Sequence, residues 1–189
     1  MIKPPYEHPF VSYLLTQIAG DRAARAALRR SLGRAPGEAP DAFRYVVPWL
    51  PDPCSQRVEA SYYLIAGLFA LHPKYIDEGN LAAHLRKLAG ADEEENQRLE
   101  RRLMAALRAH PNDLPNHLRR LVGILKAKDV PVNWHELMRD LLAWDHPERS
   151  AQKRWANAFW GGRLAAAADH PDPGIQPVEI QPEFDDDKE

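Results

Sequence analysis

The chain has 189 residues, of which 44% are hydrophobic and 28% are charged, and this composition excludes collagen-like, fully disordered and membrane classes of protein. The longest nearly unbroken apolar run, residues 60–71, is shorter than the roughly 20 residues that cross a bilayer. The formal net charge of −2 combines two parts, because residues 169–189 contain eight acids and one lysine, a charge of −7, whereas residues 1–168 carry +5.

The N-terminus and the cysteine content bear on the cell compartment. Residues 1–19 lack a cationic stretch followed by a small-residue cleavage site, so we expect a cytoplasmic protein. Cys54 is the single cysteine, which excludes an intramolecular disulfide and a cysteine-rich zinc site. The fold must therefore be held together by its hydrophobic core.

Apolar residues recur at helical spacing between prolines, and this spacing predicts an all-α protein, a compact bundle of about eight or nine helices. The predicted helices span residues 12–19, 22–32, 41–47, 55–71 and 80–89, then a helix after Asp92, then residues 112–128, 134–144 and 148–160. Residues 55–71 are apolar on nearly all sides, so this helix should be central and buried. The expected N-caps are Asp21, Asp92 and Asn133. Pro147 is expected to open the last helix, and Gly161 and Gly162 to end it.

The proposed domain organisation is one helical domain over residues 1–168, which can divide into two packed sub-bundles near residues 73–91. After Ala168 no apolar period survives, acids cluster, and four of the last nineteen residues are proline. Residues 169–189 are therefore predicted to form a disordered acidic C-terminal tail.

The sequence contains no convincing catalytic or metal-binding constellation. HELMR at residues 135–139 begins like a zinc-binding helix motif, but Arg139 stands where the second histidine ligand is required. Most other histidines stand beside prolines at predicted helix ends and are interpreted as caps, and no family signature surrounds Cys54. Gly161-Gly162-Arg163 lacks the strand and the lysine of a phosphate-binding loop. We therefore expect no active site, no metal and no cofactor.

Arginine dominates the basic residues, with 18 of 25, and it recurs on the polar faces of several predicted helices. At 100° per residue, Arg22, Arg25 and Arg29 lie within about 60° of one another, and Arg30 lies beside them. Two interpretations remain open at this point. The faces can be ordinary solvated surfaces in an arginine-rich composition, or they can form a surface for a polyanion, because the guanidinium fork suits phosphate.

Several short segments carry a family resemblance. They are ALRRSL at 27–32, PDAFRYVVP at 40–48, ERRL at 100–103, LRA at 107–109, HLRRL at 117–121, NW at 133–134, LLAW at 141–144 and PER at 147–149, with Gln152. In this order and with similar spacing, over most of residues 22–160, the chain resembles the CasB family, the small subunit of the type I-E CRISPR surveillance complex, Cascade.

The resemblance implies a helical, non-enzymatic subunit that pairs head to tail with a second copy of itself, between the Cascade backbone subunits and the large subunit. Its basic surface would hold the guide RNA (crRNA) and the target DNA, and steady the displaced non-target strand of the R-loop in antiviral defence. The matching positions nominate as nucleic-acid-binding residues Arg29, Arg30, Arg44, Arg101, Arg102, Arg108, Arg119, Arg120 and Arg149. Arg57, Lys153 and Arg154 are nearby additions to this set.

Two other classes of function are weighed beside this one. A helical protein-interaction module would use its arginine faces on acidic protein partners. An enzyme would need a constellation of catalytic groups, which the sequence does not offer. The resemblance assigns no role to residues 169–189, which can be a solubilising extension or can make an autoinhibitory contact with the protein's own arginines.

Overall fold

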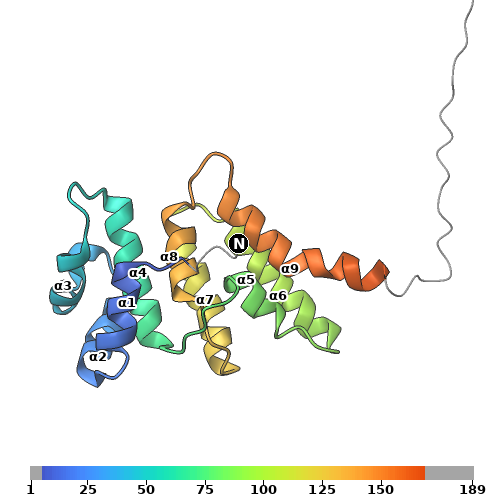
Figure 1. Cartoon of the computed structure of the whole chain (residues 1–189), viewed down its shortest axis with the longest axis horizontal. Helices are drawn as coiled ribbons and strands as arrows, with labels where there is room; N and C mark the ends of the chain where they lie inside the picture. The colour runs from blue at the N-terminus through green and yellow to red at the C-terminus, as the bar shows by residue number, and fades with distance from the viewer. Residues whose placement is uncertain (1–5, 169–189) are drawn as a thin grey trace, which may run out of the picture.

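A computed structural model describes residues 6–168 of the chain, with side-chain surroundings for residues 6–161. Within this part the protein is built from nine α-helices, and an isolated bridge between Tyr75 and Val132 is the one extended pairing (Figure 1). The prediction of an all-α fold is confirmed. The helices are α1 (Pro9–Tyr13), α2 (Arg22–Ser31), α3 (Pro40–Val46), α4 (Gln56–Leu71), α5 (Leu81–Arg86), α6 (Glu93–Arg108), α7 (Leu114–Ala127), α8 (Trp134–Leu142) and α9 (Ser150–Ala168). The acidic segment 169–189, predicted to be disordered, lies outside the described residues.

Side-chain caps begin most of the helices. An Asp21 carboxylate oxygen accepts hydrogen bonds from the amides of Ala23 and Ala24 at 2.8 and 3.0 Å, which satisfies amides that have no partner within α2. Asp92 caps α6 and Asn133 caps α8 in the same way. All three predicted N-caps are confirmed, so these helix starts follow from local chemistry.

The first and last helices differ from their predicted bounds. The predicted 12–19 helix begins earlier, at Pro9, and continues from α1 into a π-helical turn, Leu14–Ile18. Arg149 adopts a left-handed conformation, with φ 51°, and its amide closes a turn onto the His146 carbonyl, so α9 begins after this turn and not at Pro147. The prediction that glycines end this helix was wrong, because a helix-interior glycine costs only about 1 kcal/mol and four alanines follow at 165–168.

Helix α4 lies at the centre of the molecule, as predicted. It packs against α2 and α3 on one side and against α7 and α8 on the other (Figure 1). Ile65, Leu68 and Phe69 are fully buried in it. A Cβ atom on Gly67 would lie 2.6 Å from the Leu32 Cγ, so only glycine permits the close approach of α4 to the end of α2.

The described core residues form one connected cluster that includes side chains from all nine helices. Figure 1 places α1 to α4 at one end of the molecule and α5, α6 and α9 at the other, with α7 and α8 between them. The division into two sub-bundles near residues 73–91 stays a prediction. No helix in the described part of the chain is long and apolar enough to cross a membrane.

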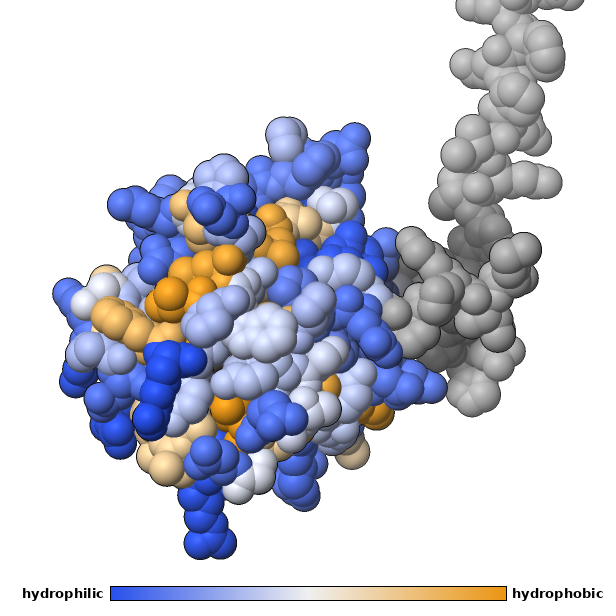
Figure 2. Space-filling model, turned by 60° about the vertical axis from the view of Figure 1, so that its left-hand side comes forward, coloured by the Kyte–Doolittle hydropathy of each residue, from blue (hydrophilic) through white to orange (hydrophobic). Residues whose placement is uncertain are grey.

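Figure 2 turns the α1 to α3 end of the molecule forward and shows an apolar band across an otherwise largely hydrophilic surface. Phe43 and Val47, at α3, are among the large apolar side chains that are exposed, by 36% and 50%.

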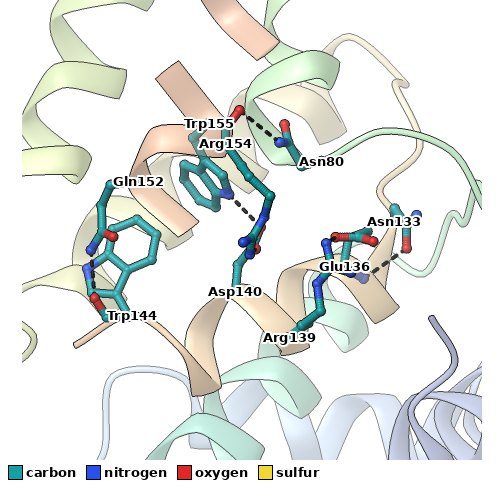
Figure 3. Close-up of polar contacts among 9 residues, drawn as sticks. All are labelled: Asn80, Asn133, Glu136, Arg139, Asp140, Trp144, Gln152, Arg154 and Trp155. Atoms are coloured by element: carbon teal, nitrogen blue, oxygen red, sulfur yellow. Dashed lines mark hydrogen bonds and ion pairs between the residues drawn. The ribbon is translucent and has the colours of Figure 1, made fainter. Parts of the chain in front are cut away.

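A buried polar network fixes α9 against α8 (Figure 3). Asp140, on α8, is fully buried; it pairs with the Arg154 guanidinium and accepts a hydrogen bond from the Trp155 indole nitrogen at 2.6 Å. Gln152 donates to the Trp144 carbonyl at 2.7 Å. These contacts set the orientation of the first turns of α9, and with it the direction in which Lys153 faces solvent.

Candidate nucleic-acid interface

Helices α6 and α7 pack together through leucines and leave their basic residues outside. Leu99 and Leu103 are buried on α6, and Leu118 and Leu125 are buried on α7. Because these apolar positions recur every three or four residues, the arginines between them point away from the core. The amphipathic pattern of each helix therefore directs its arginines to the surface.

The two helices enclose a shallow basic groove, the α6–α7 groove, of about 500 Å³. It is lined by Arg98, Arg101, Arg102, Ala105, His117, Arg120 and Leu121. A second hollow along α6 shares Arg101 and Ala105 with the groove, and it adds Arg108 and the acidic Glu100 to the same surface. Four of the nominated residues, far apart in the sequence, are thus brought onto one surface: Arg101, Arg102, Arg108 and Arg120.

The charge in the groove is largely uncompensated. At the start of α6, Glu94 pairs with Arg98 one turn later, and Glu95 pairs with Lys128 at 3.0 Å. Arg101, Arg102 and Arg120 are exposed and form no ion pair with any residue that the structure describes. Glutamates at a helix N-terminus are favourable to the helix dipole, and three of the four glutamates of α6 stand in its first turn. The side chains that line the groove itself are arginines, a histidine and apolar residues, so the groove carries a net positive charge.

A second basic surface lies at the end of α2, which the Arg119 side chain of α7 approaches. Arg29 and Arg30 are exposed in the last turn of α2, and Arg30 pairs with Asp41 at 3.1 Å. Arg119 reaches this region from α7, because its Nη1 atom lies 3.6 Å from the place of a Cβ on Gly33. The structure therefore brings Arg119 to the end of α2, while its neighbour Arg120 faces the α6–α7 groove.

Arg44 lies on a different kind of surface. Its guanidinium stacks over the Tyr45 ring, 4.7 Å from the centroid, and exposed Phe43 precedes it. This side chain combines a cation with aromatic neighbours and lies on α3, outside the α6–α7 groove.

Three other nominated arginines have partners inside the fold. Arg57 pairs with Asp145, Arg149 donates to the Leu107 carbonyl at 2.6 Å, and Arg154 pairs with Asp140. Each of these contacts joins two elements of the structure. Their contact with nucleic acid stays a prediction, as it does for exposed Lys153.

The sequence interpretation missed His117 as a residue of the groove. His117 does not end a helix; it lies in the first turn of α7 and lines the groove. Trp160, on α9, is partly buried and packs on Phe159 with ring centroids 4.9 Å apart. The sequence could have indicated this position, because His117 stands three residues before Arg120 and residues at this spacing share one face of a helix.

Two further histidines are structural. The imidazole of His72, the C-cap residue of α4, hydrogen bonds to the Val130 carbonyl at 2.7 Å. His84, interpreted as a cap, is instead buried within α5, where its Nε2 accepts a hydrogen bond from the Asn133 amide at 3.2 Å. Among the residues that the structure describes, no group of three or more His, Cys, Asp or Glu side chains is placed to hold a metal ion.

Known proteins are similar to this chain in sequence and fold. The family of the CRISPR-associated protein Cse2 matches residues 24–160. The Cse2 protein of Thermus thermophilus is 36% identical over 143 residues, which cover 74% of this chain and 79% of that protein. The crystal structure of CasB from Thermus thermophilus matches with a TM-score of 0.70 and 33% identity, over 82% of this chain and 99% of the other.

A chain of a CRISPR RNA-guided surveillance complex also matches, with a TM-score of 0.72 and 30% identity, over 84% of this chain and 95% of the other. The resemblance stated from the short sequence segments is confirmed by these matches. The chain belongs to the Cse2 family of CRISPR-associated proteins, also called CasB, of the type I-E surveillance complex Cascade.

Proposed function

We propose that this Cascade subunit is non-catalytic and that its α6–α7 groove binds the phosphate backbone of nucleic acid. The observation that carries the proposal is the gathering of Arg101, Arg102 and Arg120 from two helices around one hollow, without ion pairs to described residues. A guanidinium donates two parallel hydrogen bonds to phosphate oxygens, so such a cluster suits a polyanion.

The nucleic acids of this proposal are the crRNA and the target and non-target strands of DNA. Strand exchange between duplex DNA and an RNA–DNA heteroduplex is nearly balanced in free energy, so modest contacts to the backbone can shift the equilibrium towards the R-loop. Arginines that contact only phosphates do not read sequence. The subunit would therefore stabilise the R-loop on any target, as antiviral defence against varied sequences requires.

The surface around Arg44 supports a contact with protein. Exposed Phe43 and Val47 flank this arginine, and aromatic residues with arginine are enriched in protein interfaces. The family resemblance supplies three partners of this kind: the backbone subunits, the large subunit and a second copy of the chain.

A titration of the purified full-length protein on single-stranded and double-stranded DNA, at several salt concentrations, tests the proposal. The variant Arg101→Ala/Arg120→Ala removes two groove cations, and Arg22→Ala/Lys87→Ala removes the same charge from α2 and from the end of α5. For each phosphate that a variant no longer neutralises, the slope of log K against log salt should become shallower by about 0.9 on duplex and about 0.7 on single strands. The control should change the slope by less.

Two outcomes count against the proposal. Wild-type protein that binds no DNA or RNA at low salt, alone or assembled in the complex, would refute nucleic-acid binding. Tight binding to a protein partner after nuclease treatment would favour the interaction-module alternative.

Removal of residues 169–189 gives a further comparison. Tighter DNA binding by the shortened protein would indicate autoinhibition by the acidic segment, and unchanged binding would indicate a solubilising extension.

A further inference from the structure

His117 is the one groove-lining side chain, among those described, whose charge can change near neutral pH. It is partly exposed, and it lines the α6–α7 groove together with Arg98, Arg101, Arg102 and Arg120. The other lining residues are arginines, which stay protonated, or apolar residues. Imidazole is the side chain that gains or loses a proton in the physiological pH range.

The charges that face His117 come from both helices of the groove. From α6 they are the guanidinium groups of Arg101 and Arg102, and that of Arg98, which is paired with Glu94. From the α7 side they are Arg120 and the exposed carboxylate of Asp113, one turn before His117.

These charges include more guanidinium groups than carboxylates, so the groove attracts phosphate to the side of His117. An anion bound beside an imidazole favours its protonated form and gives it a charge-assisted hydrogen bond. Phosphate binding and proton uptake should therefore be coupled at this position. By the same coupling, the groove should hold phosphate more tightly when His117 is protonated.

We propose that His117 is a pH-dependent phosphate contact of the α6–α7 groove, an inference that rests on the proposed nucleic-acid binding. Protonation adds one cation to the site, so affinity for nucleic acid rises as the pH falls through the range in which imidazole titrates. Each bound chain takes up a fraction of one proton, and one further phosphate of the bound strand is held.

The test measures the affinity of the full-length protein for a labelled single-stranded DNA at about pH 8 and about pH 5.5, on either side of the imidazole range. The variant His117→Asn removes the titrating group at similar helix propensity. The control His146→Asn alters an exposed histidine in the turn between α8 and α9, where an asparagine oxygen can still accept the Glu148 amide. Circular dichroism at both pH values verifies that each protein is folded.

Wild type and the His146 variant should bind roughly two- to fivefold more tightly at the lower pH, the range of one solvent-exposed ion pair. Their salt slope should also steepen by up to about 0.7 as one more phosphate is neutralised. His117→Asn should lose most of both responses. His117→Arg, a second variant that keeps a permanent charge, should show the steeper slope at both pH values.

The inference and the proposed function fail in different ways. Wild-type protein that binds no DNA at either pH would refute both. Wild-type binding whose pH response is the same in His117→Asn would refute the role of His117 and leave the groove proposal standing.

Discussion

Acidification tests the buried contact between His84 of α5 and the start of α8. His84 is 1% exposed, and its Nε2 accepts the Asn133 amide at 3.2 Å, while the Asn133 side chain caps α8 through the Glu136 amide. Burial lowers the pKa of His84 from 6.5 to about 4, and the neighbouring Lys87 charge adds a smaller decrease. A protonated Nε2 could not accept the amide, so the folded protein requires the neutral imidazole.

The sign and size of the effect follow from these two pKa values. The unfolded chain binds a proton at His84 below about pH 6.5, whereas the folded chain does so only near pH 4, so acid favours unfolding between these values. The free energy of unfolding should fall by about 2 kcal/mol by pH 5 and by about 3 kcal/mol by pH 4, at 1.36 kcal/mol per pH unit. Above the imidazole range this residue contributes no pH dependence.

Urea unfolding followed by circular dichroism, from about pH 7 to about pH 4, measures this loss in wild type and in His84→Gln. The glutamine oxygen can accept the Asn133 amide but does not titrate. Other groups with shifted pKa values, such as Asp140 and His135, are present in both proteins and cancel in the difference. If that difference is the same at every pH, the assignment of His84 as a buried neutral acceptor is refuted.

Two further predictions concern packing. Gly67→Ala should destabilise the fold by about 1–3 kcal/mol, because the added Cβ would overlap Leu32 at the end of α2. Gly123→Ala, whose added Cβ would have no atom within 4 Å, should stabilise α7 by about 0.5–1 kcal/mol. Equal melting temperatures for the two variants would contradict the close contact between α4 and α2. Asp140→Ala should lower the free energy of unfolding, measured in urea, by about 3–5 kcal/mol, because it leaves the Arg154 guanidinium and the Trp155 indole nitrogen without their partner. The double variant Asp140→Leu/Arg154→Leu should recover much of this loss. If Asp140→Ala is as stable as wild type, the network does not stabilise the fold.

Local chemistry explains why so much of the fold could be predicted. A capping oxygen acts on amides two or three residues away, so Asp21, Asp92 and Asn133 mark helix starts without reference to the remainder of the chain. The start of α9 was mispredicted because it depends on a contact that is distant in the sequence. Pro147 is compatible with a first helical turn, but Arg149 is held in a left-handed conformation as its side chain reaches the Leu107 carbonyl on α6, a contact made across 42 positions of sequence.

The distinction between local and long-range contacts also applies to the arginines. Helical periodicity shows that Arg101 and Arg120 face away from the leucines of their own helices, but it cannot show that they face each other. Likewise, Arg57 and Arg154 resemble the surface arginines in sequence, and only the packing of α8 brings Asp145 and Asp140 to them.

The sequence by itself determined the helical class, most helix boundaries, the buried central helix and the family of this protein, because each depends on neighbouring residues or on their order. Only the tertiary structure decided which cations share the α6–α7 groove and which are held within the fold. The physical reason is that a guanidinium lies at the end of a long, flexible side chain, so its partner is chosen by helices that meet through long-range packing.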